Sequence, residues 1–295
     1  MKGSIRKNKI FIRVVLIVVI GTGLIIGGMK LATSNSEKLD STLLNQMVIN
    51  APNLELGSRM KAENGIFGGK FIYKRYKDID GYIIPWTDVT GNYSVFGQDS
   101  VGFMQLNNSN GTHDFVEGTS QKMMKFYNQD IAYKKVATEL KAILGNENLV
   151  MEVAISFDKT YSLERIRKMT PENLNIAWLW LDEDDNGGQL EALAPDHVYG
   201  FEGLQKPNEK VPSDDVYQGN YNNFLSALEV LQEDSAKAAT LHDKYSKLKL
   251  KQLKFKGMVL TGQATSFKNL SDQKFIRASE IGATADIVPY IKPYK

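Results

Sequence analysis

The sequence predicts an α+β (or mixed α/β) domain that lies outside the cell membrane and follows a single transmembrane helix. First, residues 14–29 form an apolar run without a charged side chain. Second, the first 30 residues hold six of the 36 basic residues and none of the 34 acidic ones, so the remainder has 30 basic and 34 acidic residues and a net charge of −4. Third, strand-like and helix-like patterns alternate along the second half, as they do in α+β and α/β domains.

The transmembrane helix is expected over residues 10–30. The uncharged run reaches back to Ile10 if Arg13 extends its side chain toward the head groups. That gives about 20 residues, the length that a helix needs to cross a ~30 Å hydrocarbon core. A cleaved secretory signal is the alternative, with residues 32–34 (Ala-Thr-Ser) as its cleavage site. The run is longer than the roughly 7–15 apolar residues of such signals, which favours a retained anchor.

The tail of residues 1–9 sets the orientation of this helix. It holds four basic residues and no acidic one. Because positively charged flanks stay on the cytoplasmic side, we expect a cytoplasmic tail, a single-pass helix in the cell membrane and an extracytoplasmic C-terminal domain. The absence of cysteine excludes a lipoprotein anchor, and it means that the outer domain is held together by its core rather than by disulfides.

Residues 31–118 are expected to be a stalk followed by a β-rich region. Residues 31–50 form the stalk, which is helical from Ser41. Over 65–86, aromatic and β-branched residues lie between glycines, a pattern typical of strands and hairpins. The turn glycines are Gly65, Gly68 and Gly69. Residues 87–118 are rich in turn-forming residues, and the clearest loop is at 107–111.

Residues 119–295 are expected to be one α+β domain. A helix is predicted over about 130–144, because five apolar residues recur near helical spacing before Gly145. These are Ile131, Val136, Leu140, Ile143 and Leu144. A strand follows at 149–157, and Ser162 is the expected N-cap of a short helix.

The last part of the chain has clearer boundaries. A strand at 175–182 is too apolar for a sheet edge, and a polar loop with three prolines follows it. Leucine, alanine and phenylalanine near helical spacing predict a long helix over about 221–246. A strand at 254–262, a short helix at 264–272 and one or two strands over 275–288 close the domain.

The sequence contains no motif that identifies an enzyme. His113, His197 and His242 are more than 40 residues apart and lack the close spacing of a local metal site. No nucleophile elbow, phosphate-binding loop or dinucleotide fingerprint is present. We therefore expect no catalytic residues, no cofactor and no metal ligands. The near-neutral charge outside the membrane also argues against nucleic acid as a partner.

One acidic segment has the opening pattern of a calcium-binding loop, D-x-D-x-N-G. The pattern falls on Asp182, Asp184, Asn186 and Gly187. Position twelve of such a loop should be a bidentate glutamate, but Leu193 stands there and Glu191 comes two residues early. The favoured interpretation is an acidic turn after a buried strand, with residue types that suit turn geometry; a weak calcium site is the alternative.

The three tryptophans lie in apolar strand contexts. Trp178 and Trp180 share one face of the strand at 175–182, and Trp86 ends an aromatic run. Such a pair is typical of core packing, so we expect structural residues rather than a carbohydrate-binding platform.

Several stretches in both halves match the pattern of one known family. In the first half these are the basic tail with its membrane helix, Pro52-Asn53 and YKDIDGYIIPW (76–86). In the second half they are EVAISFDKTYSLERI (152–166), NIAWLWLD (175–182), VYGFEG (198–203), KGMVLTG (256–262) and FIRASEIGATAD (275–286). Together they resemble the paired sigma factor regulator N-terminal and C-terminal domains of membrane anti-sigma factors of Gram-positive bacteria. The most specific part is EVAISFDK-x-YS followed by the W-x-W strand.

The resemblance implies a protein that holds an extracytoplasmic-function sigma factor inactive at the membrane while its outer domain senses the state of the envelope. A tail of about nine residues is too short to form a folded sigma-binding domain. Two interpretations stay open: the tail is an anchoring peptide that acts through another membrane regulatory subunit, or the true start lies upstream. The alternative function is a membrane-tethered binding module for a cell-wall component or calcium, with no action on a sigma factor.

Overall fold

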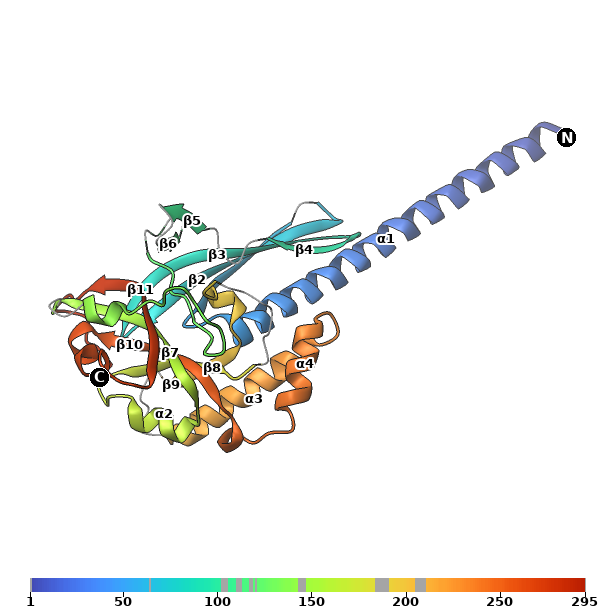
Figure 1. Cartoon of the computed structure of the whole chain (residues 1–295). Coiled ribbons are helices and arrows are strands. Elements are labelled where there is room, and N and C mark those ends of the chain that lie inside the picture. The colour runs from blue at the N-terminus through green and yellow to red at the C-terminus, as the bar shows by residue number, and fades with distance from the viewer. Residues whose placement is uncertain are drawn as a thin grey trace.

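The chain forms one long helix that projects from a domain of two antiparallel sheets and several shorter helices (Figure 1). The structure is a computed structural model, and it describes residues 2–63, 65–101, 106–109, 113–116, 119, 121–142, 147–183, 191–204 and 211–294. This arrangement confirms the predicted α+β fold that follows a single apolar helix.

Helix α1 (Lys2–Asn50) runs without a break from the basic tail through the apolar run and the stalk. The stalk is therefore helical along its whole length, not only from Ser41. Its section Asn8–Asn50 is long and apolar enough to cross a membrane, and no residue of the most apolar window is buried in the structure. From Ala32 onward one stripe of the helix is buried against the first sheet. This stripe consists of Ala32, Ser36, Leu39, Leu43 and Met47.

The first sheet is a meander in the strand order β1-β2-β3-β4. Its strands are β1 (Glu55–Glu63), β2 (Gly68–Ile79), β3 (Tyr82–Ser94) and β4 (Gly97–Val101). Gly65 has a φ of +83° in the first turn, as the glycine pattern predicted, whereas Gly68 and Gly69 are already part of β2. A separate hairpin consists of β5 (Leu106–Ser109) and β6 (His113–Val116).

The expectation of a turn-rich segment at 87–118 was largely wrong, because β3 continues through residue 94 and three further strands follow. Buried and less buried residues alternate along β3, so pairing with β2 and β4 outweighs the turn-forming residues in this segment. The expected loop at 107–111 begins inside β5, and its residues 110–111 lie outside the described part of the chain.

The second sheet has five antiparallel strands in the order β11-β7-β10-β8-β9. Its strands are β7 (Leu149–Tyr161), β8 (Asn175–Leu181), β9 (Gly200–Leu204), β10 (Phe255–Gln263) and β11 (Ile276–Asp286). Helices α2 (Leu163–Met169), α3 (Ser213–Leu231) and α4 (Ala236–Tyr245) accompany it, with short 3-10 helices η1 (Glu139–Ala142), η2 (Pro195–His197), η3 (Leu250–Gln252) and η4 (Ala264–Leu270). All the strands predicted in this half are confirmed, and so is Ser162 as N-cap, because its hydroxyl accepts from the Arg165 N–H.

The helix predicted over 130–144 is wrong in its described part, where only η1 is helical. The segment instead runs along the sheet edge formed by β11. Thr138 bridges Ser279 in parallel, and the Ser279 N–H donates to the Ala137 carbonyl at 2.9 Å. The Arg277 guanidinium donates to the carbonyls of Asn128 and Ile131. These tertiary hydrogen bonds satisfy the backbone in place of a helix, which overrides the apolar spacing.

The long helix predicted over 221–246 is two helices, α3 and α4, and the first of them begins earlier, at Ser213. The break falls at residues 232–235. Ser235 is an N-cap whose hydroxyl accepts from the Ala238 N–H at 3.2 Å. Serine favours a cap over a helix interior, so the chain restarts there in a new direction. The short helix at 264–272 is the 3-10 helix η4.

Candidate functional site

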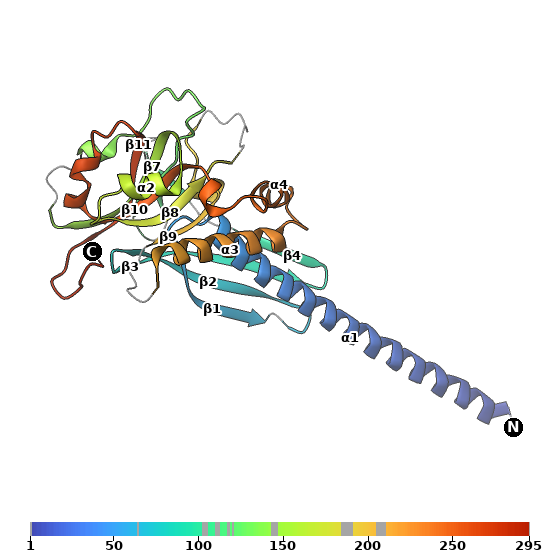
Figure 2. The ribbon, with the colours of Figure 1, turned by 90° about the horizontal axis from the view of Figure 1, so that it is seen from below.

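The C-terminal part of α1 lies between the first sheet and helix α3, and it contacts both parts of the folded domain (Figure 2). Leu39 and Leu43 pack into an apolar cluster with residues of β2 and β3. Gly91 in β3 allows this approach, since a Cβ there would lie 2.9 Å from Leu39 Cδ1. Two polar contacts join the helix to the second part of the domain: Lys38 Nζ to Asp234 Oδ1 at 2.7 Å, and Asn50 Nδ2 to the Asp196 carbonyl at 3.1 Å.

A buried ion pair, which we call the joint, links the two sheets directly. Lys77 of β2 and Glu152 of β7 are 2% and 0% exposed, and Lys77 Nζ lies 2.6 Å and 2.8 Å from the two carboxylate oxygens. Asn53 Nδ2 donates to the same carboxylate at 2.7 Å, and the Ala283 N–H of β11 donates at 3.0 Å. A buried charge is tolerated when it is paired and its remaining hydrogen bonds are satisfied, as they are here.

The environment of the joint is strongly desolvated. Burial lowers the pKa of Lys77 from its ordinary value, and the Glu152 carboxylate opposes that shift. The ammonium also lies 4.4 Å from the ring centroid of Trp86, a cation–π contact. Burial likewise lowers the pKa of Arg75 to about 10, and Arg75 Nε donates to the Thr87 carbonyl at 2.7 Å.

Sequence reasoning missed the joint, although a signal for it exists. The alternate residues Phe71, Tyr73, Arg75, Lys77 and Ile79 all face inward on β2. Charged residues in the inward positions of an otherwise apolar strand face indicate buried partners. The partner itself lies 75 residues away, so local spacing does not reveal it.

The turn between β2 and β3 is tied to the second sheet as well. Asp80, buried and at a φ of +56°, accepts from Asn175 Nδ2 of β8 at 3.0 Å. It also accepts from the Tyr294 N–H at 3.0 Å, while the Tyr294 hydroxyl donates to Asp78 Oδ2 at 2.9 Å. The first sheet is therefore held at one end by the joint and by this turn.

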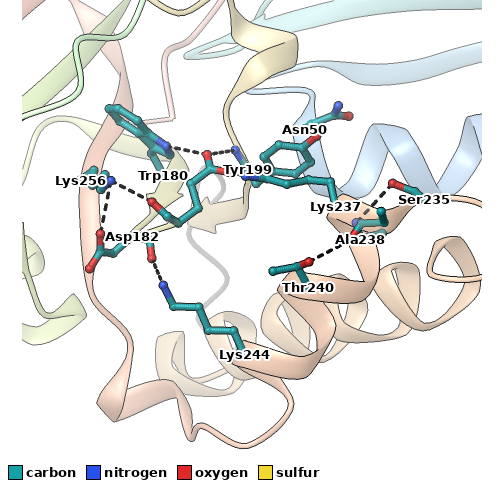
Figure 3. A network of polar contacts seen from close by, with 12 residues as sticks. Asn50, Trp180, Asp182, Tyr199, Ser235, Lys237, Ala238, Thr240, Lys244 and Lys256 are labelled. Carbon is teal, nitrogen blue, oxygen red and sulfur yellow. Dashed lines mark hydrogen bonds and ion pairs between the residues drawn. The ribbon is translucent and has the colours of Figure 1, made fainter. Parts of the chain in front are cut away.

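The acidic segment after β8 begins among lysines, as Figure 3 shows. Lys244 Nζ and the Tyr245 hydroxyl both donate to the Asp182 carbonyl at 2.7 Å. Lys256 Nζ donates to the Glu183 carbonyl at 2.8 Å and lies 3.5 Å from Asp182 Oδ1. Asp184, Asn186 and Gly187 lie outside the described residues. The described end of the segment thus already has cationic partners for its acidic side chains.

Glu183 is the buried carboxylate of this group. Its Oε1 accepts from Trp180 Nε1 at 3.3 Å and from the Tyr199 N–H at 3.2 Å, and its Oε2 lies 2.9 Å from Lys237 Nζ. Burial raises the pKa of Glu183 above its ordinary value of 4.5, and the Lys237 ammonium opposes that shift.

A groove of about 470 Å³ lies where α1, β1, β9 and α3 meet. Its walls include Met47 and Val48 from the helix, Leu54 before β1, Glu202 in β9 and Asn220 in α3. The strands β1 and β9 are edges of their sheets, so the groove runs between two sheet edges beside the helix.

The remaining sequence-predicted residues occupy separate positions. Trp178 and Trp180 are buried in one cluster on β8, which agrees with the expected packing role. His113, His197 and His242 lie in β6, η2 and α4 respectively. Within the described ranges, no group of three or more histidine, aspartate or glutamate side chains is arranged to hold a metal ion.

Two family models match the chain, and each covers one of the two sheet-containing parts described above. Residues 4–84 match the sigma factor regulator N-terminal model, and residues 140–283 match the sigma factor regulator C-terminal model. The two matches identify sigma factor regulator domains, and α1 contains a candidate membrane span. The chain belongs to the sigma factor regulator family, and the Lys77–Glu152 joint connects its two matched regions. No curated protein and no solved structure gives a significant match.

Proposed function

We propose that this protein is a membrane-anchored anti-sigma factor with an extracytoplasmic sensing domain. Residues 1–9 are the cytoplasmic tail, 10–30 the transmembrane helix, 31–118 the stalk with the β-rich N-terminal region, and 119–295 the C-terminal α+β domain. The two family matches support the regulatory role, and the basic tail supports the orientation.

The observation that carries the proposal is the continuity of α1. The same helix holds the exposed apolar run and, further along, Leu43 and Met47 in the core of the domain. A helix without a break transmits tilt or rotation along its length, whereas a flexible stalk would not. A change in the outer domain therefore moves the part of α1 that crosses the membrane.

The joint supports the same mechanism. Because Lys77 and Glu152 hold the two sheets together through a desolvated ion pair, the outer domain moves as one body on α1. A ligand or envelope change that favours one arrangement of this body shifts the population of helix orientations. The output partner is an extracytoplasmic-function sigma factor or a second membrane regulatory subunit. The lipid bilayer is the other partner, and no catalytic step, cofactor or nucleic acid is involved.

The test is transcription in a strain that lacks the gene. We expect one sigma-dependent regulon to rise, the full chain to restore repression, and a soluble fragment that begins at Ser34 to fail because it lacks the tail and the membrane helix. Unchanged transcription in the deletion strain would remove the regulator role and favour a membrane-tethered binding module. Full repression by the soluble fragment would contradict the topology.

A further inference from the structure

Two hairpin tips of the first sheet lie together against α1, next to the end of its apolar run. The tips are Ile66-Phe67 between β1 and β2, and Val95-Phe96 between β3 and β4. The Val95 N–H donates to the Phe67 carbonyl at 3.0 Å, which joins one tip to the other. Figures 1 and 2 both show the hairpins extending along α1 toward its N-terminal end.

Close contacts fix both tips to the helix. A Cβ on Gly28 would lie 2.9 Å from Phe67 Cε1 and 3.6 Å from Val95 Cγ1, so glycine leaves room for the Phe67 ring directly beside the helix. Asn35 Nδ2 of the helix donates to the Ser94 carbonyl at 2.7 Å. Both tips therefore lie at the level of Gly28 along the helix.

The level of the tips along α1 coincides with the outer end of the proposed transmembrane segment. The apolar run from Ile10 to Met29 covers about 30 Å at 1.5 Å per residue, which is the thickness of the hydrocarbon core. Gly28 lies in its last turn, so the tips beside it are level with the boundary between acyl chains and head groups. Lys30 on the helix follows directly and suits the head-group side of that boundary.

The tips expose apolar side chains, whereas the hairpin loops of a soluble domain usually expose polar ones. Phe96 is 98% exposed, and Ile66 and Phe67 are 56% and 40% exposed. Exposed aromatic and branched aliphatic side chains gathered at one end of a molecule indicate a surface that meets another apolar phase. Removing such side chains from water is favourable, which favours contact with the membrane.

A groove at the same level continues this surface. It has a volume of about 490 Å³ and lies between Met29 and Thr33 of the helix and Ile66 and Tyr93 of the sheet. Lys61 also lines it, with its ammonium 5.3 Å from the Tyr93 ring centroid. Glu63 lines the groove as well, so the groove presents one basic and one acidic side chain at the level expected for the lipid head groups.

We propose that Ile66, Phe67 and Phe96 insert into the outer leaflet beside α1, so that the first sheet has a second attachment to the bilayer. The inference rests on the proposed transmembrane helix. This second attachment fixes the tilt of the sheet relative to the membrane. It also makes the regulator sensitive to the packing of outer-leaflet lipids.

The test uses tryptophan quenching by brominated acyl chains, with the full chain in nanodiscs of phosphatidylglycerol and phosphatidylethanolamine. The three native tryptophans are buried, so they give a constant background. Three variants are compared: Phe96→Trp at the tip, Ile83→Trp as the matched control, and Leu24→Trp in the apolar run. Ile83 is 57% exposed and lies at the opposite end of the same sheet, beside the β2–β3 turn.

We expect the tryptophan fluorescence of Phe96→Trp and Leu24→Trp to fall in brominated discs. The fluorescence of Ile83→Trp and of the unmodified chain should not change. If Leu24→Trp is quenched and Phe96→Trp behaves like Ile83→Trp, the tips do not insert and only this inference is overturned. If Leu24→Trp is not quenched either, the transmembrane helix itself is wrong and the proposed function fails with it.

Discussion

Lys77→Met should destabilise the folded domain far more than the loss of an ordinary ion pair. Met keeps the length of the aliphatic chain but leaves the fully buried Glu152 carboxylate, among the described residues, with the Asn53 and Ala283 donors alone. Removing one partner of a buried pair costs about 3–5 kcal/mol. For a domain of this size, that corresponds to a fall in Tm of roughly 6–20 °C.

The matched control lies on the same strand. Lys74 forms an ion pair with Asp88 at 2.6 Å, but its side chain is about half exposed. Exposed pairs are worth about 0–1 kcal/mol, so Lys74→Met should leave Tm nearly unchanged. The double variant Lys77→Met/Glu152→Gln should recover most of the loss, because no unpaired charge stays buried.

The assay is thermal unfolding of the full chain in nanodiscs, followed by tryptophan fluorescence. Trp86 reports on the joint itself, because its ring lies beside the Lys77 ammonium. Equal Tm values for Lys77→Met and Lys74→Met would refute the reasoning. So would a double variant that is less stable than Lys77→Met alone.

Three further predictions use the same preparation or intact cells. Trp180→Ala should cost about 3–5 kcal/mol, because the ring is buried against Phe126; wild-type stability would mean that it does not pack the core. Because burial raises the pKa of Glu183, the protonated side chain contributes stability below its ordinary pKa of 4.5, and this contribution is lost as pH rises through the folded-state pKa. Glu183→Gln should therefore lose less Tm above pH 4.5 than the unmodified chain does. Parallel plots of Tm against pH for the two proteins would contradict this. Glu37→Cys, on the exposed side of α1, should react with an impermeant maleimide in intact cells while Asn8→Cys does not, and the reverse pattern would invert the topology.

Much of the second sheet could be predicted from the sequence, because its strands combine apolar, β-branched residues with clear boundaries. The run at 175–182 is buried along the whole of β8, and Ser162 caps α2 as expected. Predictions failed where a segment distant in the sequence supplies the backbone hydrogen bonds. Apolar spacing over 130–144 resembled a helix, but hydrogen bonds from Arg277 and Ser279 hold the segment along β11.

The continuity of α1 was only partly predictable. The buried stripe from Ala32 to Met47 has steps of three and four residues, which is helical spacing. This spacing in the sequence predicts a helix through the whole stalk. The joint could not be located, because the pairing of Lys77 with Glu152 depends on how two sheets meet. The same is true of the hairpin tips, since their position beside Gly28 depends on how the first sheet packs on α1.

The central claim, that an unbroken α1 couples the outer domain to the cytoplasm, is tested most directly by placing a proline at Ser34. Ser34 is exposed and lies near the start of the packed part of the helix, between the buried residues Ala32 and Ser36, so Ser34→Pro breaks the helix at a cost of about 3 kcal/mol without removing a core side chain. Ser34→Ala is the matched control. Transcription of the sigma-dependent regulon is measured in cells that express each variant at equal membrane levels. The account predicts normal repression and signal response with Ser34→Ala and loss of regulation with Ser34→Pro, and identical regulation by the two variants would contradict it.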